Sequence, residues 1–299
     1  MEKLIDLHVH TNVSDGFLTP KEVIDEAFKN NVSFLAIADH DTIDAYSDDL
    51  FEYASKKEIK IIPAVEISTK YKKCGIHVLG YNFDLKNDFF RKKLNELRNA
   101  RHDYLRDVSL KLQNLGYSVN ISSLDKIEAV TKAHIALDVI SNKQNEETLI
   151  ENFGHIPSKG EFIETVMNEG CPAYVKKNTI SPKEAADLIR LAGGKVVLAH
   201  PVAYKYEDNL TDDDILDIVR DMNIDAIESN YIYIDRNNNK INECSLWNEF
   251  AKKNNLFTTI GSDFHNDDGI RPIIGLVNEN LSISDEQINK IIEYLEINN

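Results

Sequence analysis

The chain has 299 residues, enough for one large α/β domain or for a core domain with a smaller insertion. Its 34 basic and 50 acidic residues give a formal net charge of −16, and an acidic surface repels the phosphate backbone of long nucleic acids. The 12 glycines and 7 prolines are too few for a collagen-like or low-complexity chain, and the three cysteines lack the spacing of a disulfide framework or a zinc ribbon.

Short apolar runs alternate with helix signals in the first 85 residues, which is typical of βα units around a mostly parallel sheet. We expect strands at 4–9, 34–38, 59–65 and 76–81. A helix is expected to begin at Thr19-Pro20-Lys21-Glu22, where threonine is the N-cap, proline takes the first helical position and glutamate closes a capping box. A second helix is expected at about 44–57. Only a short polar link, residues 71–75, separates the last two strands, which favours a hairpin over a helical crossover.

From about residue 86 to residue 170 the sequence changes in character. Charged helical periodicity dominates, strand-like runs are absent, and Ser158 and Glu161 form another capping box. We therefore expect a helical insertion over 86–170 that covers the active site, set between the two parts of one barrel domain, 1–85 and 171–299.

Alternation of strands and helices resumes after the insertion. Ser181-Pro182-Lys183-Glu184 predicts a helix start, and Gly193-Gly194 predicts its end. Further strands are expected at 196–199, 226–228 and 257–260, with helices at about 212–222, 241–253 and 285–295. About seven strands around a helical insertion predict an α/β barrel, or an incomplete one.

Six of the nine histidines lie at or beside the ends of expected strands: His8, His10, His40, His77, His200 and His265. A single histidine is usually structural, but that reading does not explain six in such positions. The carboxyl ends of parallel strands meet on one face of a barrel, where binding sites are built. Residues two apart in a strand point the same way, so His8 and His10 can face one point. A hairpin centred near Tyr71 and Lys72 would place His77 opposite Glu66.

Three carboxylates accompany these histidines and bring the candidate ligands to nine: Asp15, Glu66 and Asp263. Nine ligands are too many for one tetrahedral ion, but they fit two or three ions that share a bridging carboxylate. Imidazoles and carboxylates without thiolates suit zinc, manganese or iron. Three divalent cations carry more positive charge than three carboxylates carry negative charge, so the site would be locally positive although the protein is acidic. Such a site would attract a small phosphorylated substrate.

These segments resemble the polymerase and histidinol phosphatase (PHP) family, and they follow the family's order along nearly the whole chain. The matching motifs are His8-Val9-His10, Ser14-Asp15-Gly16, Ala38-Asp39-His40-Asp41-Thr42, Glu66-Ile67-Ser68, His77-Val78-Leu79-Gly80-Tyr81, Ala199-His200-Pro201 and Gly261-Ser262-Asp263-Phe264-His265. The resemblance implies a distorted, TIM-like (β/α)7 barrel with a trinuclear site. It also implies a metal-dependent phosphoesterase in which hydroxide activated by manganese, iron or zinc attacks phosphorus.

The resemblance also divides the nine ligands among three ions. It assigns one ion to His8, His10, Glu66 and Asp263. It assigns a second to Glu66, His77 and His200, and a third to Asp15, His40 and His265. The catalytic positions that it implies are Asp263, Glu66, His200 and His265.

The insertion resembles the branch of the family that removes phosphate from nucleoside 3′,5′-bisphosphates and trims short oligoribonucleotides from the 5′ end. In that branch a basic helix and an Arg-Pro-His-Ile-Ala-like segment approach the substrate phosphate, and Arg101 and His134 match them here. Lys132 and Ala133 replace the Arg-Pro pair, and Tyr104 stands where another arginine is common, which leaves the exact substrate open. The expected partner is a small phosphorylated nucleotide, either a bisphosphate or a short 5′-phosphorylated oligonucleotide.

Other readings of the same residues remain open. The nearest is a phosphatase for histidinol phosphate or another phosphomonoester. A metal-dependent amidohydrolase is less favoured, since the carbamylated strand-end lysine common in such sites is missing from these motifs. A non-catalytic binding module is disfavoured because all nine ligand positions are filled. No run approaches the roughly 20 apolar residues of a membrane helix, so we expect a cytoplasmic protein without a membrane partner. The oligomeric state is open.

Several polar residues near the motifs have no definite role. Asp39 and Asp41 flank His40 and are candidates for holding ligand imidazoles, or for capping local turns. Glu228, at the end of an expected strand, either orients ligands or closes the barrel, and we favour the second role. His102 and His155 are expected to be surface or structural residues.

Overall fold

The computed structural model describes residues 4–125, 127, 130–176, 179–224, 226–235, 237–276 and 284–295. The chain divides into two compact units, Met1–Leu94 with Ile180–Asn299, and Asn95–Thr179. The sequence analysis placed the helical insertion at 86–170. The first boundary between the two units lies inside the long helix α3 (Asp88–Asn114). The start of this helix belongs to the first unit, where its buried residue Phe90 packs against Phe83 at a ring-centroid distance of 4.8 Å.

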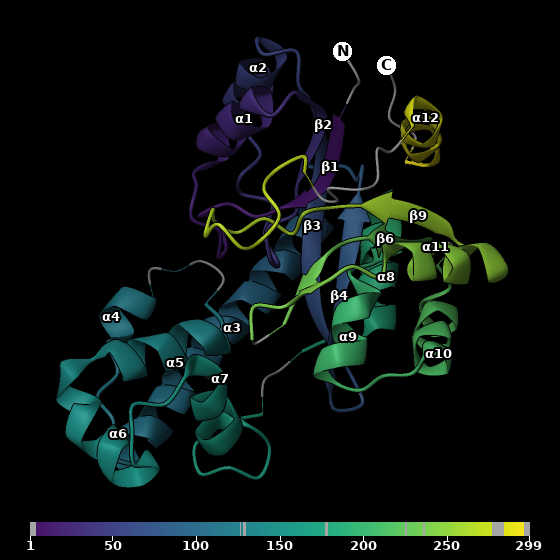
Figure 1. Cartoon of the computed structure of the whole chain (residues 1–299). Helices are drawn as coiled ribbons and strands as arrows, with labels where there is room; N and C mark the ends of the chain where they lie inside the picture. The colour runs from purple at the N-terminus through teal and green to yellow at the C-terminus, as the bar shows by residue number, and fades with distance from the viewer. Residues whose placement is uncertain are drawn as a thin grey trace. The chain divides into compact units, whose positions relative to one another are not determined.

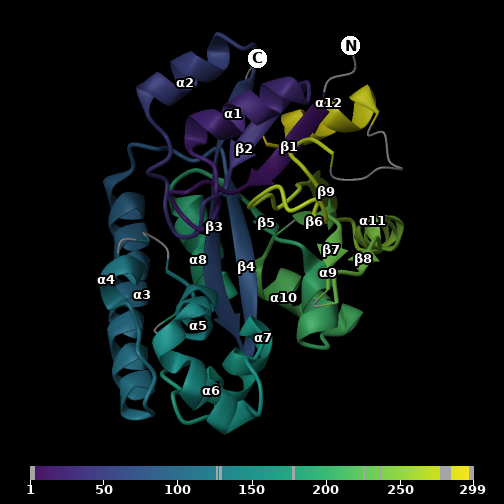
Figure 2. The ribbon, with the colours of Figure 1, turned by 60° about the vertical axis from the view of Figure 1, so that its left-hand side comes forward.

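The first unit contains one seven-stranded sheet with the order β1-β2-β3-β4-β5-β6-β9 (Figures 1 and 2). Its strands are β1 (Leu4–Val9), β2 (Val32–Ile37), β3 (Lys60–Tyr71), β4 (Cys74–Tyr81), β5 (Lys195–Leu198), β6 (Ala226–Asn230) and β9 (Phe257–Ile260). Within this sheet β4 is antiparallel to both β3 and β5, and the remaining neighbours are parallel. The seven expected strands and the expected hairpin are thus confirmed.

The sheet curves around a single apolar core. Every strand contributes a buried side chain to one cluster: Ile5, Ala36, Ile62, Leu79, Val197, Ala226 and Ile260. The Tyr81 hydroxyl donates to the Leu7 carbonyl at 2.9 Å, which joins β4 to β1 although they are not neighbours in the sheet. The two edge strands of the sheet are β1 and β9. Val9 of β1 and Phe264, which follows β9, form an isolated parallel bridge instead of a continuous ladder. This architecture agrees with the expected distorted, TIM-like α/β fold.

Helices cover the outer face of this sheet. They are α1 (Pro20–Lys29), α2 (Asp48–Ser55), α8 (Pro182–Leu191) and α11 (Cys244–Lys253). Helix α10 (Asp212–Met222) packs against α8, while α12 (Asp285–Tyr294) adds apolar side chains to the inner core. The capping box predicted at Thr19 is formed, and the helix start predicted at Ser181 is confirmed and also has a capping box. The short helix α9 (Pro201–Glu207) follows β5. Strands β7 (Tyr233–Ile234) and β8 (Lys240–Ile241) pair as a small ladder that the sequence analysis did not predict, because two residues carry no periodic signal.

The second unit is helical in its described residues. It contains most of α3, then α4 (Ile121–Leu124), α5 (Lys132–Ser141), a 3-10 turn (Lys143–Asn145), α6 (Glu146–Phe153), α7 (Lys159–Phe162) and a π-helical turn (Ile163–Met167). It has an apolar core of its own, to which α3, α5 and α7 contribute Leu105, Ile135 and Phe162. Across the described part of the chain, we find no helix of the length and hydropathy needed to cross a membrane.

Candidate metal centre

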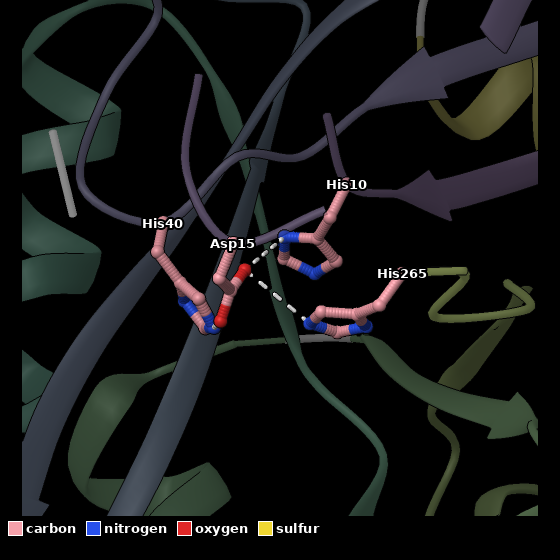
Figure 3. Close-up of side chains that lie close together, drawn as sticks. All are labelled: His10, Asp15, His40 and His265. Carbon is pink, nitrogen blue, oxygen red and sulfur yellow. Dashed lines mark ion pairs between the residues drawn. The ribbon is translucent and has the colours of Figure 1, made fainter. Parts of the chain in front are cut away.

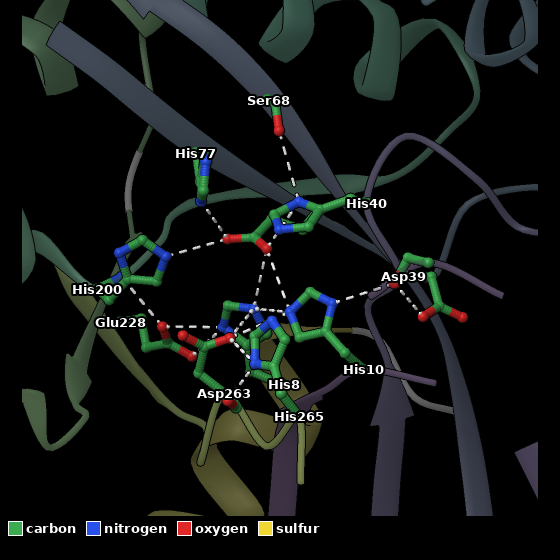
Figure 4. A network of polar contacts seen from close by, with 12 residues as sticks. His8, His10, Asp39, His40, Ser68, His77, His200, Glu228, Asp263 and His265 are labelled. Atoms are coloured by element: carbon green, nitrogen blue, oxygen red, sulfur yellow. Dashed lines mark hydrogen bonds and ion pairs between the residues drawn. The ribbon is translucent and has the colours of Figure 1, made fainter. Parts of the chain in front are cut away.

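The nine predicted ligands all lie in the first unit, where the strands bring them to one edge of the sheet. Figure 4 shows the histidines of this set and Asp263 gathered together. Most of them follow the carboxyl ends of strands that run in the same direction. His77 instead lies near the start of β4, but β4 runs against its neighbours. The start of β4 therefore lies at the same edge as the carboxyl ends of β3 and β5, and a residue from a reversed strand joins the group.

The register of the β3–β4 hairpin differs slightly from the expected one. Tyr71 pairs with Cys74, so the turn lies one residue later than predicted, and His77 is opposite Ser68. Glu66 lies two residues from Ser68 on the same face of the strand. Nδ1 of His77 is therefore still 3.0 Å from Oε1 of Glu66.

Glu66 is the centre of the cluster. Its side chain is only 1 % exposed, and both oxygens face histidines. Oε2 lies 3.3 Å from Nε2 of His8, 3.3 Å from Nε2 of His10 and 3.1 Å from Nδ1 of His40. Oε1 lies 3.0 Å from Nδ1 of His77 and 3.1 Å from Nε2 of His200. One buried carboxylate thus contacts five imidazoles, which suits a ligand that bridges cations.

A first group of ligand atoms comes from His8, His10, Glu66 and Asp263. The two Nε2 atoms are 3.1 Å apart, and Oδ1 of Asp263 lies 3.4 Å from that of His8 and 3.1 Å from that of His10. Four ligands placed tetrahedrally at 2.0–2.1 Å from one ion would lie about 3.3–3.4 Å apart. The observed spacing therefore fits one cation.

A second group consists of His10, Asp15, His40 and His265 (Figure 3). Asp15 is its centre, since Oδ1 lies 3.5 Å from Nδ1 of His10 and 3.3 Å from Nε2 of His265. Oδ2 of Asp15 lies 3.7 Å from Nε2 of His40. His10 and His40 each present their other ring nitrogen to Glu66, so these two imidazoles stand between the second group and the Glu66 carboxylate.

The third group differs from the one that the family resemblance implied. The resemblance assigned His200 to the ion of Glu66 and His77, whereas the structure groups His40 with that pair. Nε2 of His200 approaches the same Oε1 atom of Glu66 as His77 does. Its Nδ1 atom is buried and has no hydrogen-bond partner among the described residues.

The donor set fits divalent metal ions of borderline character. It consists of imidazole nitrogens and carboxylate oxygens, and none of the three cysteines belongs to the groups formed by the described residues. Such ligands suit zinc, manganese or iron. Two of the ligands also have unusual backbone angles, with φ of +22° at His200 and +51° at Asp263. Strained backbone of this kind persists where the surrounding structure holds a functional side chain in place.

Charge interactions inside the cluster are strong. Burial lowers the pKa of His8, but the nearby carboxylates, Glu228 foremost, raise it well above its usual value. Burial also opposes protonation of His10, yet hydrogen bonds to two carboxylates raise its pKa to about 10. Burial dominates at His40 and lowers its pKa to about 3. Burial alone would raise the pKa of Glu66, but the surrounding imidazoles hold it well below its usual range. Cation binding would therefore displace protons from imidazoles around an ionised carboxylate.

Glu228 supports two ligands from behind. Both of its oxygens lie 3.1 Å from Nδ1 of His8, and one accepts a hydrogen bond from the backbone N–H of His200 at 3.0 Å. A side chain on Gly261 would overlap Cβ of His8 and Oε1 of Glu228, so this position requires glycine. The sequence analysis favoured a role for Glu228 in closing the barrel. The structure instead places it against a candidate ligand, as expected of a residue that orients a metal-binding imidazole.

The two aspartates beside His40 hold backbone and hydroxyl groups. Asp39 accepts hydrogen bonds from the N–H and hydroxyl of Thr11, both at 2.7 Å, and from the Ser14 hydroxyl at 2.6 Å. Asp41 accepts from the N–H of Ser68 at 2.9 Å. Asp39 thereby orders the loop that carries Asp15, and Asp41 joins the end of β2 to β3.

Two further residues near the cluster were missed in the sequence. Asp6 is fully buried and accepts backbone N–H groups of Ser262 and Gly275, both at 2.9 Å, while burial raises its pKa to about 6. The Tyr231 hydroxyl donates to Oδ2 of Asp263 at 3.3 Å. A carboxylate between the apolar residues Ile5 and Leu7 was a signal for Asp6, whereas nothing near Tyr231 in the sequence pointed to Asp263.

The two expected substrate-binding residues belong to the second unit. Arg101 lies in α3 and is buried. His134 closes the capping box of α5, where its Nδ1 accepts the backbone N–H of Thr131 at 3.1 Å. His102 pairs with Asp125 at 3.0 Å, and the exposed His155 pairs with Glu161 at 3.1 Å.

Comparisons with known proteins agree with the fold. The chain is 31 % identical to the 5′-3′ exoribonuclease Rnm of Escherichia coli over 88 % of its length and 85 % of that protein. It is 26 % identical to the 3′,5′-nucleoside bisphosphate phosphatase of Chromobacterium violaceum, with 87 % of each chain covered. A solved structure described as an amidohydrolase from Chromobacterium violaceum has a TM-score of 0.74 at 24 % identity, covers 97 % of this chain and 96 % of its own, and shows the shared fold alone.

The sequence model of the PHP domain matches residues 6–237, which include seven of the nine candidate ligands. Metal-dependent phosphoesterase activity follows from this match and from the two relatives named above. The chain therefore belongs to the PHP family of metal-dependent phosphoesterases.

Proposed function

We propose that this enzyme hydrolyses phosphate esters of small nucleotides, either nucleoside 3′,5′-bisphosphates or short 5′-phosphorylated oligonucleotides. The convergence of five imidazoles on the buried carboxylate of Glu66 carries the proposal, since it provides a compact site for several cations. The names of the relatives, an exoribonuclease and a nucleoside bisphosphate phosphatase, support nucleotides as substrates. The net charge of −16 confines attraction for phosphate to the site itself.

Two or three divalent ions, manganese, iron or zinc, are proposed to occupy the cluster. The nine proposed ligands are His8, His10, Asp15, His40, Glu66, His77, His200, Asp263 and His265. Such ions supply Lewis-acid stabilisation of charge on the phosphoryl oxygens and an activated water nucleophile. Glu66 would hold adjacent cations together through its two oxygens, and Glu228 would keep Nε2 of His8 directed at the cluster.

The helical unit is proposed to supply Arg101 and His134 for binding of the substrate phosphate. Both positions match the family branch that acts on nucleotides. An arginine guanidinium can bind phosphate through two parallel hydrogen bonds, which favours this role for Arg101.

A phosphate-release screen tests the proposed function. Protein loaded separately with manganese, iron or zinc would be offered a nucleoside 3′,5′-bisphosphate, a 5′-phosphorylated dinucleotide and histidinol phosphate, and its metal content would be measured by elemental analysis. We expect the highest kcat/KM for one of the two nucleotides and at least two metal ions per chain. A preference for histidinol phosphate would refute the proposed substrate, and a single tightly bound ion would refute the multinuclear site.

A further inference from the structure

A small cavity opens beside the candidate metal centre. It has a volume of about 180 Å³, and its polar lining comes from Glu207, Tyr231, Tyr233, Ser262, Asp263 and Arg271, all within the first unit. Asp263 belongs both to this lining and to the first ligand group, through Oδ1 toward the histidines and Oδ2 toward Tyr231. A group esterified to a phosphate held at the cluster would therefore lie next to the cavity.

The helix that carries Glu207 begins beside a candidate metal ligand, and a residue of a neighbouring strand holds Glu207 in place. Glu207 is the last residue of α9, the helix that begins immediately after the candidate ligand His200. Tyr233 lies in the small β7–β8 ladder, and its hydroxyl donates to Oε1 of Glu207 at 3.0 Å. Glu207 is therefore held in place by a neighbour, which suits a carboxylate that recognises a ligand.

The charges of the residues that line the cavity disfavour the binding of a second phosphate group there, in addition to the one at the metal centre. Glu207 and Asp263 both bear carboxylates, and a phosphate group only accepts hydrogen bonds at its ionised oxygens. The positive charge of Arg271 is offset by Asp268, since Nε lies 3.5 Å from Oδ2 of that residue. Asp268 is itself held by the backbone N–H groups of Ile270 and Arg271, both at 2.9 Å.

A hydroxyl group matches this lining better. A hydroxyl donates one hydrogen bond and accepts others, so it can donate to Glu207 while accepting from the Arg271 guanidinium. In a nucleoside 3′,5′-bisphosphate the 3′ and 5′ oxygens are esterified, which leaves the 2′-hydroxyl as the free hydroxyl of the sugar. We propose that the cavity between Glu207 and Arg271 binds the ribose of the substrate and recognises its 2′-hydroxyl. The inference rests on the proposed nucleotide substrate and adds selection of ribonucleotides over deoxyribonucleotides.

The test compares kcat/KM for a ribonucleoside 3′,5′-bisphosphate with kcat/KM for its 2′-deoxy counterpart, using the metal-loaded full chain. We expect the wild type to prefer the ribonucleotide by about tenfold or more, because hydrogen bonds to charged groups are of that strength. Glu207→Gln and Arg271→Gln should each reduce this ratio toward one. Arg271 is partly exposed, so its variant remains informative if Glu207→Gln fails to fold. Glu249→Gln, at an exposed position of α11, is the matched control and should keep the wild-type ratio.

The outcomes separate this inference from the proposed function. A wild type that hydrolyses both nucleotides equally well would overturn the ribose site and leave the nucleotide phosphoesterase intact. The ribose site would also be overturned if both variants kept the wild-type ratio. A wild type that releases phosphate from neither nucleotide would overturn the proposed function, and the inference with it.

Discussion

Glu228 lies directly behind His8, with both carboxylate oxygens 3.1 Å from Nδ1, while the opposite ring nitrogen of His8 faces Glu66. A carboxylate in this position keeps the proton on Nδ1 and leaves the Nε2 lone pair for a cation. This relationship between an orienting residue and a ligand gives the first of five predictions.

Replacing Glu228 with glutamine should weaken metal binding and activity without unfolding the chain. The amide cannot hold the His8 N–H and the His200 N–H with the charge of the carboxylate, and loss of such an orienting partner typically costs about 10- to 100-fold in metal affinity or activity. Metal titration and kcat/KM at saturating metal measure the two effects. Glu243→Gln removes a carboxylate bound to Lys205, and this control should behave like the wild type. Unchanged metal affinity in Glu228→Gln would contradict the orienting role.

Replacing Glu66 with glutamine, or Asp263 with asparagine, should nearly abolish phosphate release. Each change removes a carboxylate that contacts several imidazoles, and an amide does not bridge cations as a carboxylate does. Circular dichroism should show a folded protein, and elemental analysis should show fewer ions per chain. Glu52→Gln, at an exposed position of α2, is the control. Full activity in either cluster variant would refute the shared site.

Replacing Gly261 with alanine should both destabilise the protein and impair the metal centre. The added methyl group would overlap His8 and Glu228, and overpacking of this kind costs about 1–3 kcal/mol. Thermal unfolding and metal titration report the two consequences. Gly160→Ala is the matched control, because a Cβ at that helical position meets nothing within 4 Å. Wild-type Tm and metal affinity in Gly261→Ala would contradict this prediction, because they would mean that the backbone shifts to accommodate the methyl group without loss of stability.

Chelation of the metal should lower Tm and abolish activity, and added manganese should restore both. A ligand that binds only the folded state at 100 times its Kd adds about 2.7 kcal/mol of stability. Differential scanning calorimetry across a manganese series measures the shift, which should shrink strongly in Glu66→Gln. If manganese, iron and zinc all leave Tm unchanged, the cluster does not bind metal in the folded protein.

Replacing His134 with alanine, or Arg101 with lysine, should raise KM or lower kcat for nucleotide substrates while the metal content stays at the wild-type value. Lysine keeps the charge of Arg101 but loses the paired donors of the guanidinium. The exposed His155 offers a control, since His155→Ala removes an imidazole of the same unit. Nucleotide kinetics indistinguishable from the wild type in both variants would remove these residues from the substrate site.

Much of the fold could be predicted because its signals are local. Thr19 and Ser181 predicted helix starts, and both form their capping boxes, since a cap depends on residues three positions apart. The short polar link after β3 similarly predicted a hairpin. The two-residue strands β7 and β8 are too short to leave such a pattern, although Tyr233 of β7 lines the proposed ribose site.

By itself the sequence determined which side chains could meet at the centre, because strand ends of one barrel face converge wherever the strands are placed. Only the tertiary structure decided how these ligands are grouped and which other residues contact them. One ring nitrogen of His40 faces Glu66 and the other faces Asp15, so this imidazole lies between the two carboxylates. Glu228 is 220 residues from His8, and a contact over that separation is set by the packing of β6 and β1 around a shared core, which leaves no trace in either strand's own sequence.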